Sequence, residues 1–205
     1  MDSIIFDLDG TLWDATDKIT IAWNEIAREE RILNSDITPK RLQSLFGQPM
    51  SDIAAAIFAN VDKAEQLRLI DLCAAREHEF LLRDGAPLYP NLEETLKYLY
   101  DKYKLFIVSN CQAGYIEVFT KVTGLGKYFK GHLCPGDTGA NKAENILEII
   151  SQHGLESPVY VGDTDGDNKA SKKAGIPFVY ATYGFGETTD VDYMISDLNE
   201  LMKLF

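Results

Sequence analysis

Four short apolar runs, each ending in a polar loop, constrain the fold of this chain more than any other feature. The runs are Ile4–Phe6, Leu105–Val108, Val159–Val161 and Ile176–Tyr180. A short apolar run that stops at polar residues is typical of a parallel strand buried on both faces. Segments with helical periodicity lie between these runs: Leu92–Tyr103, Ala113–Val122, Ala143–Ile150 and Lys169–Ala174. This alternation predicts an α/β fold with a doubly wound parallel sheet.

Residues 15–82 interrupt the alternation, because they contain no strand-like run and show amphipathic helical stripes instead. The stripes are Ile19, Trp23, Ile26 and Ala27; Leu42, Leu45 and Phe46; Ile53, Ala56 and Ile57; and Leu67, Ile70, Leu72, Ala75 and Phe80. The chain returns through Gly85–Pro87 and Tyr89–Asn91, which are turn-rich and suited to a hinge. We therefore predict a small all-helical cap domain over residues 15–82. It is inserted into a Rossmann-like core made of residues 1–14 and 83–205.

Composition and charge restrict the partners of this chain. Twenty Lys and Arg against 32 Asp and Glu give a net charge of -12, the wrong sign for nucleic acid. No apolar stretch approaches the roughly 18 residues of a membrane span, and the N-terminus lacks a signal-peptide pattern. Three cysteines form no CxxC pair. We expect a cytoplasmic protein that binds neither nucleic acid nor membrane, as a monomer or a weak homodimer.

A pair of carboxylates follows the first apolar run. The residues Asp7, Asp9, Gly10 and Thr11 stand at this strand end, with the two acids two positions apart. If the strand alternation persists, both side chains point the same way. One carboxylate can then act as a nucleophile while the other does acid–base work, and Thr11 can hydrogen-bond the loop. The alternative is a strand end with an ordinary capping turn.

Two further segments carry groups suited to an anion. Ser109 and Asn110 follow the second apolar run at a strand-to-helix junction, where backbone N–H groups favour anions. A helix N-cap explains Ser109 equally well. Lys142 opens a predicted helix, where the helix dipole disfavours a cation unless an anion lies opposite. A solvated surface lysine is the alternative.

The segment Gly162–Asp167 holds three acids after the third apolar run. Carboxylate oxygens of this kind suit Mg²⁺. A calcium loop of the EF-hand type requires Gly at its sixth position and Glu at its twelfth. Counted from Asp163, these positions hold Asn168 and Ala174, so this alternative is excluded. An acidic turn without any ligand stays an alternative.

In this order, and each at a strand end, the four motifs resemble those of the haloacid dehalogenase superfamily. The similarity is to phosphatases with a helical cap inserted after the first motif, the group that includes phosphoglycolate phosphatases. In that family the motifs read DxDGT, then Ser or Thr, then Lys, then GDxxxD. The corresponding residues here are Asp7, Asp9, Gly10 and Thr11; Ser109; Lys142; and Gly162, Asp163 and Asp167.

The resemblance implies a role for each of these residues. Asp7 would attack phosphorus, and Asp9 would protonate the leaving oxygen and later activate water. Mg²⁺ would lie on Asp7, on the backbone carbonyl of Asp9 and on Asp163. The phosphoryl oxygens would be bound by Ser109, with Asn110, and by Lys142, which Asp167 would orient.

The expected function is therefore that of a magnesium-dependent phosphatase acting on a small phosphomonoester such as phosphoglycolate. A phosphomutase is the nearest alternative, although Gly162 stands where mutases of this group commonly carry an acid. A non-catalytic module that binds a phosphorylated ligand is the other alternative, and Asp9 argues against it. In the cap, Gln48 lies in a Gly-x-Pro turn and is expected to contact the leaving group, unless the turn merely joins two helices.

Overall fold

The computed structural model describes residues 1–205 and contains one six-stranded parallel sheet. The strands are β1 (Ser3–Phe6), β2 (Lys104–Val108), β3 (Phe129–Leu133), β4 (Pro158–Gly162), β5 (Phe178–Ala181) and β6 (Tyr193–Ile195). Their spatial order is β3-β2-β1-β4-β5-β6, and every pairing is parallel. The prediction of an α/β fold with a doubly wound parallel sheet is confirmed.

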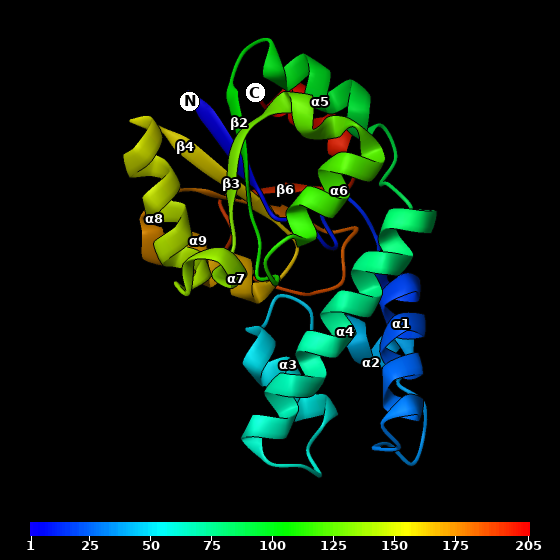
Figure 1. Cartoon of the computed structure of the whole chain (residues 1–205). Helices are drawn as coiled ribbons and strands as arrows, with labels where there is room; N and C mark the ends of the chain where they lie inside the picture. Colours follow the sequence, from blue (N-terminus) through cyan, green and yellow to red (C-terminus); the bar gives the residue numbers. More distant parts are fainter.

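Helices cover both faces of this sheet. The segments α5 (Leu92–Tyr100) and α6 (Tyr115–Thr123) lie on one side of the strands, and α8 (Lys142–His153) and α9 (Asp165–Ala174) lie on the other (Figure 1). The shorter elements are the helices α7 (Pro135–Thr138) and α10 (Leu201–Leu204) and the 3-10 turns Leu125–Tyr128 and Leu198–Glu200. None of the helices has the length and apolarity that a membrane span requires.

Successive side chains of β1 point to opposite faces of the sheet, and each face has its own hydrophobic cluster. Ile4 and Phe6 join the larger hydrophobic cluster, which includes Leu96 of α5 and Phe119 of α6. Ile5 joins the smaller cluster on the other face, with residues of α8 and α9. All three β1 side chains are fully buried, because a central parallel strand is covered from both sides.

The sequence interpretation missed two strands, β3 and β6. Both are edge strands of the sheet. In β3 one residue, Lys130, is exposed and the other four are only partly buried, and in β6 both Tyr193 and Met194 are exposed. An edge strand has one neighbour instead of two, so it does not need the continuous apolar run by which the central strands were found.

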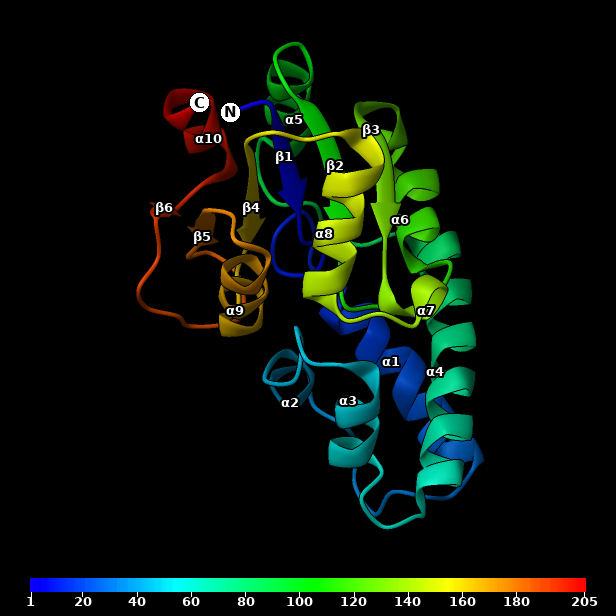
Figure 2. The same cartoon turned by 90° about the vertical axis from the view of Figure 1, so that its left-hand side faces the viewer.

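Four helices lie together beyond the carboxyl ends of the strands (Figures 1 and 2). They are α1 (Thr16–Glu29), α2 (Pro39–Gln43), α3 (Met50–Ile57) and α4 (Lys63–Asp84). The two connections to the sheet run side by side, since the Asp14 N–H donates to the Pro87 carbonyl at 2.9 Å and the Tyr89 N–H donates to the Leu12 carbonyl at 3.2 Å.

The apolar stripe predicted for α4 was correct only in part, since Ile70 is buried and Leu72 and Phe80 are partly buried against the core. Leu67, expected inside, is 44% exposed, and Ala75 is exposed as well. The buried face carries Leu69, Ile70, Cys73, Glu77 and Leu81. An acidic residue therefore stands on the inward face, at the four-residue spacing of a helical stripe.

Candidate active site

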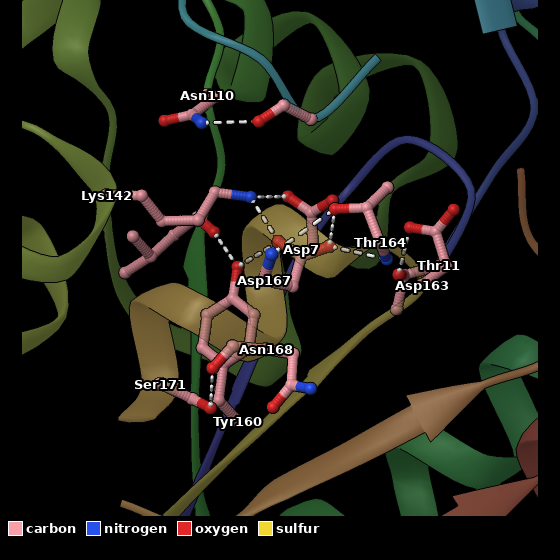
Figure 3. A network of polar contacts seen from close by, with 12 residues as sticks. Asp7, Thr11, Asn110, Lys142, Tyr160, Asp163, Thr164, Asp167, Asn168 and Ser171 are labelled. Atoms are coloured by element: carbon pink, nitrogen blue, oxygen red, sulfur yellow. Dashed lines mark hydrogen bonds and ion pairs between the residues drawn. The ribbon is translucent and has the colours of Figure 1, made fainter. Parts of the chain in front are cut away.

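Residues of all four predicted motifs converge at the carboxyl edge of the sheet (Figure 3). Asp7 follows β1, Ser109 follows β2 and Asp163 follows β4, while Lys142 is the first residue of α8. All four are buried, with no more than 4% of each residue exposed. Parallel strands deliver their carboxyl ends to one edge, which brings together residues from distant parts of the chain.

Lys142 joins two carboxylates inside the protein. Its Nζ lies 2.9 Å from Asp7 Oδ1 and 2.6 Å from Asp167 Oδ1. The helix start is fixed by a capping box, in which Asn141 and Glu144 satisfy each other's backbone N–H groups. Burial alone would lower the pKa of Lys142, but the charges of Asp167 and Asp7 raise it above its ordinary value. The lysine is therefore a fixed positive charge at the site.

Asp167 is held by its own helix. Its Oδ2 accepts hydrogen bonds from the Thr164 N–H at 2.9 Å and from the Thr164 hydroxyl at 2.6 Å. The Asp167 N–H donates in turn to the Thr164 hydroxyl oxygen at 3.3 Å, which completes the capping box of α9. The other carboxylate oxygen of Asp167 meets Lys142. Because both oxygens are engaged, Asp167 positions the lysine ammonium group.

Asp163 is fixed by two donors from different loops. The Thr11 hydroxyl donates to Oδ1 at 3.2 Å, and the Phe185 N–H donates to Oδ2 at 2.7 Å. Gly10 adopts a φ of +81°, and a Cβ at this position would stand 2.2 Å from Asp163 Oδ2. Glycine is thus required where the β1 loop passes this carboxylate. The Phe185 contribution comes from its backbone, so it leaves no side-chain signal in the sequence.

Three carboxylates form a cluster that could hold a metal ion. Oxygen atoms of Asp7, Asp163 and Asp167 lie within 4.8 Å of one another. Burial raises the pKa of Asp7 to about 6, against the opposing effect of Lys142. Burial and the charges of Asp167 and Asp7 also raise the pKa of Asp163 well above its ordinary value. These hard oxygen donors have more negative charge than one lysine balances, so their chemistry fits a divalent cation.

Asp9 is held apart from this cluster. Its Oδ1 accepts from the Tyr115 hydroxyl at 2.7 Å and from Trp13 Nε1 at 3.0 Å. The strand ends at Phe6, so the simple alternation expected through Asp9 does not persist. Asp9 and Asp7 nevertheless line the same cavity. Burial raises the pKa of Asp9 to about 7, which the two donors only partly oppose.

A small cavity of about 30 Å³ lies between the sheet edge and the four helices. Asn110 lines it, but its side-chain amide donates to the Gly47 carbonyl at 2.8 Å and so joins the sheet to the α2–α3 turn. Gln48 was expected here and is exposed instead, outside this cavity. Its amide turns back toward Ser44, because the turn directs Gly47 and Phe46 inward.

Glu77 is an acidic cavity residue that the sequence interpretation missed. It lies on the inward face of α4 and is 2% exposed. Trp23 Nε1 donates to its Oε2 at 2.7 Å, and the Gln112 amide donates to Oε1. The signal in the sequence was an acid at four-residue spacing from Cys73 and Leu81.

A family model described as haloacid dehalogenase-like hydrolase matches residues 4–181. The chain belongs to this family. Among curated relatives, a phosphoglycolate phosphatase of Shigella boydii is 26% identical over 234 aligned residues, covering 97% of this chain and 90% of the relative. The expected resemblance and the expectation of a phosphatase-type hydrolase agree with this membership and with that relative.

Solved structures of haloacid dehalogenase-like hydrolases share the fold of this chain. One from Streptococcus pneumoniae has a TM-score of 0.86 and 23% identity, covering 100% of this chain and 98% of that one. A protein from Haemophilus somnus, described as a predicted phosphoglycolate phosphatase, has a TM-score of 0.84 and 21% identity, covering 100% and 97%. These similarities extend over the sheet and the four helices beyond it, so the whole chain has the architecture of this family.

Proposed function

We propose that this chain is a magnesium-dependent phosphatase that hydrolyses small phosphomonoesters through an aspartyl-phosphate intermediate. The observation that carries the proposal is the buried ion triad, in which Lys142 lies between Asp7 and Asp167, beside the carboxylate of Asp163. A nucleophilic carboxylate next to a fixed cation, with an acid–base carboxyl in the same cavity, is the set of groups that covalent phosphoryl transfer needs.

In the first step, a carboxylate oxygen of Asp7 forms a bond to phosphorus as the bond from phosphorus to the ester oxygen breaks. The leaving oxygen takes a proton from Asp9, which burial keeps protonated up to about pH 7. Tyr115 and Trp13 both donate to Oδ1 of Asp9, which leaves Oδ2 as the oxygen that would carry the proton.

In the second step, the aspartyl-phosphate is hydrolysed. Asp9, now ionised, takes a proton from the attacking water as an oxygen–phosphorus bond forms. The bond between phosphorus and Asp7 breaks, and the carboxylate is restored. Lys142 and Ser109 would bind the phosphoryl oxygens in both steps, with Asp167 holding the lysine in place. Thr11 supports the loop by its bond to Asp163.

The metal that we propose is Mg²⁺, held by Asp7, the backbone carbonyl of Asp9 and Asp163. The donor set fits, because these are hard oxygen ligands and the buried carboxylates lack sufficient counter-charge. When bound, Mg²⁺ supplies positive charge that lowers the repulsion between the Asp7 carboxylate and an anionic phosphate.

We infer that helices α1–α4, predicted as residues 15–82, act as a cap over the site. The support is that the cavity is lined from both sides and that Asn110 reaches across it to Gly47. The structure extends α4 to Asp84, two residues past the predicted boundary. Closure of such a cap excludes water while the leaving group departs.

The test is release of inorganic phosphate from a panel of small phosphomonoesters, with and without Mg²⁺. Phosphoglycolate belongs in the panel because of the curated relatives. Asp7→Asn should abolish release while the protein stays folded. Asp165→Asn is the matched control, since it removes an exposed carboxylate at the first residue of α9. Metal-independent release, or full activity of Asp7→Asn, would overturn the proposal.

A further inference from the structure

The side of the cavity that the four helices form contains an acidic side chain and no basic one. Its residues are Ile19, Trp23, Phe46, Gly47, Met50, Ile53 and Glu77. One of them is charged, and it is an acid. The one basic side chain that lines the cavity is Lys142, which belongs to the sheet side and already meets two carboxylates.

The basic residues of the helical segment point elsewhere. Lys18 pairs with Asp84, and Arg76 pairs with Glu25 at 2.7 Å and with Glu29. Lys40 and Arg41, which precede the α2–α3 turn, are exposed and do not line the cavity. A second anionic group on a substrate would therefore find no cation on this side of the cavity.

Glu77 is a buried acid without a cationic partner. Both of its oxygens accept N–H donors, one from Trp23 and one from Gln112. No salt bridge reaches it. Burial raises its pKa to about 8, and the charge of Asp9 adds to this shift. The position thus favours one unit of positive charge, carried by a proton or by a ligand.

We propose that the cavity takes the leaving group of an amino-alcohol phosphomonoester, with the ammonium group against Glu77 and the aromatic rings of Trp23 and Tyr115. This inference rests on the phosphatase function proposed above. The ammonium would replace the proton of Glu77, and aromatic rings attract cations. A carboxylate in the same place, such as that of glycolate, would instead face Glu77 and Asp9.

Three substrates that differ chiefly in their terminal group test the inference. They are 2-aminoethyl phosphate, propyl phosphate and phosphoglycolate, which end in an ammonium, a methyl and a carboxylate. We expect kcat/KM to fall in this order for the wild-type enzyme, by roughly tenfold or more from the ammonium to the methyl ester. This series needs no variant, so it stands even if a substitution impairs folding.

The variant Glu77→Gln tests whether Glu77 causes the preference for the ammonium-bearing ester. It should reduce the ratio of kcat/KM for 2-aminoethyl phosphate over propyl phosphate to near one. Glu79→Gln, which removes an exposed carboxylate from the same helix, should keep the ratio.

Faster hydrolysis of phosphoglycolate or propyl phosphate by the wild type would overturn the inference and leave the phosphatase function standing. An unchanged ratio in Glu77→Gln would overturn it as well. Absence of phosphate release from all three esters and from the wider panel would overturn the proposed function, and this inference with it.

Discussion

Replacing Glu77 by Gln should stabilise this protein at neutral and higher pH. Burial raises the pKa of Glu77 from its ordinary 4.5 to about 8, so the native state binds the proton more tightly than the unfolded chain does. Between these two pH values the native state holds more protons, and the free energy of unfolding therefore falls as pH rises. A glutamine cannot ionise, so the free energy of unfolding of Glu77→Gln does not fall with pH for this reason.

The magnitude follows from the two pKa values. One pKa unit corresponds to about 1.4 kcal/mol, so the free energy of unfolding should fall by about 3 kcal/mol between pH 5 and pH 7.5 because of Glu77. The glutamine side chain fits the same contacts, because its oxygen can accept from Trp23 Nε1. Its amide can then donate to a reoriented Gln112.

Denaturant unfolding of wild type, Glu77→Gln and Glu79→Gln at pH 5 and pH 7.5 measures this. The advantage of Glu77→Gln over wild type should grow by about 3 kcal/mol between the two pH values. Glu79→Gln controls for removal of a helix charge, since Glu79 is exposed. Equal pH dependence in wild type and Glu77→Gln would refute the reasoning, because Glu77 would then ionise as it does in water.

Three other substitutions test the packing around the site. In Gly136→Ala the new Cβ would stand 2.0 Å from the Ala113 backbone nitrogen, so we expect a loss of about 2 kcal/mol, seen as a lower melting temperature. Lys142→Met leaves two buried carboxylates without their cation and should destabilise the fold by about 3 kcal/mol or more in denaturant unfolding. Asn110→Ala removes the bond to the Gly47 carbonyl; we expect a stability change of only about 1 kcal/mol but faster proteolysis of the α2–α3 turn.

The central part of the fold could be predicted because burial leaves a pattern in the sequence. Strands β1, β2, β4 and β5 are covered on both faces, and each appears as an uninterrupted apolar run. The edge strands β3 and β6 have no such requirement, so their residues show no continuous run. The stripe predicted for α4 was wrong at Leu67 and Ala75 for a related reason, since a long helix that contacts α1, α3 and α6 has several competing apolar stripes.

The sequence by itself determined which groups meet at the edge of the sheet. A parallel sheet places its strand ends together, so the residues after each apolar run had to converge, as Asp7, Ser109 and Asp163 do. The tertiary structure alone decided what faces them across the cavity. The rotation of α4 turns Glu77 inward, and the α2–α3 turn leaves Gln48 outside. The local sequence pattern determines neither the rotation of α4 nor the direction of the α2–α3 turn. Both depend on contacts between segments that lie far apart in the chain.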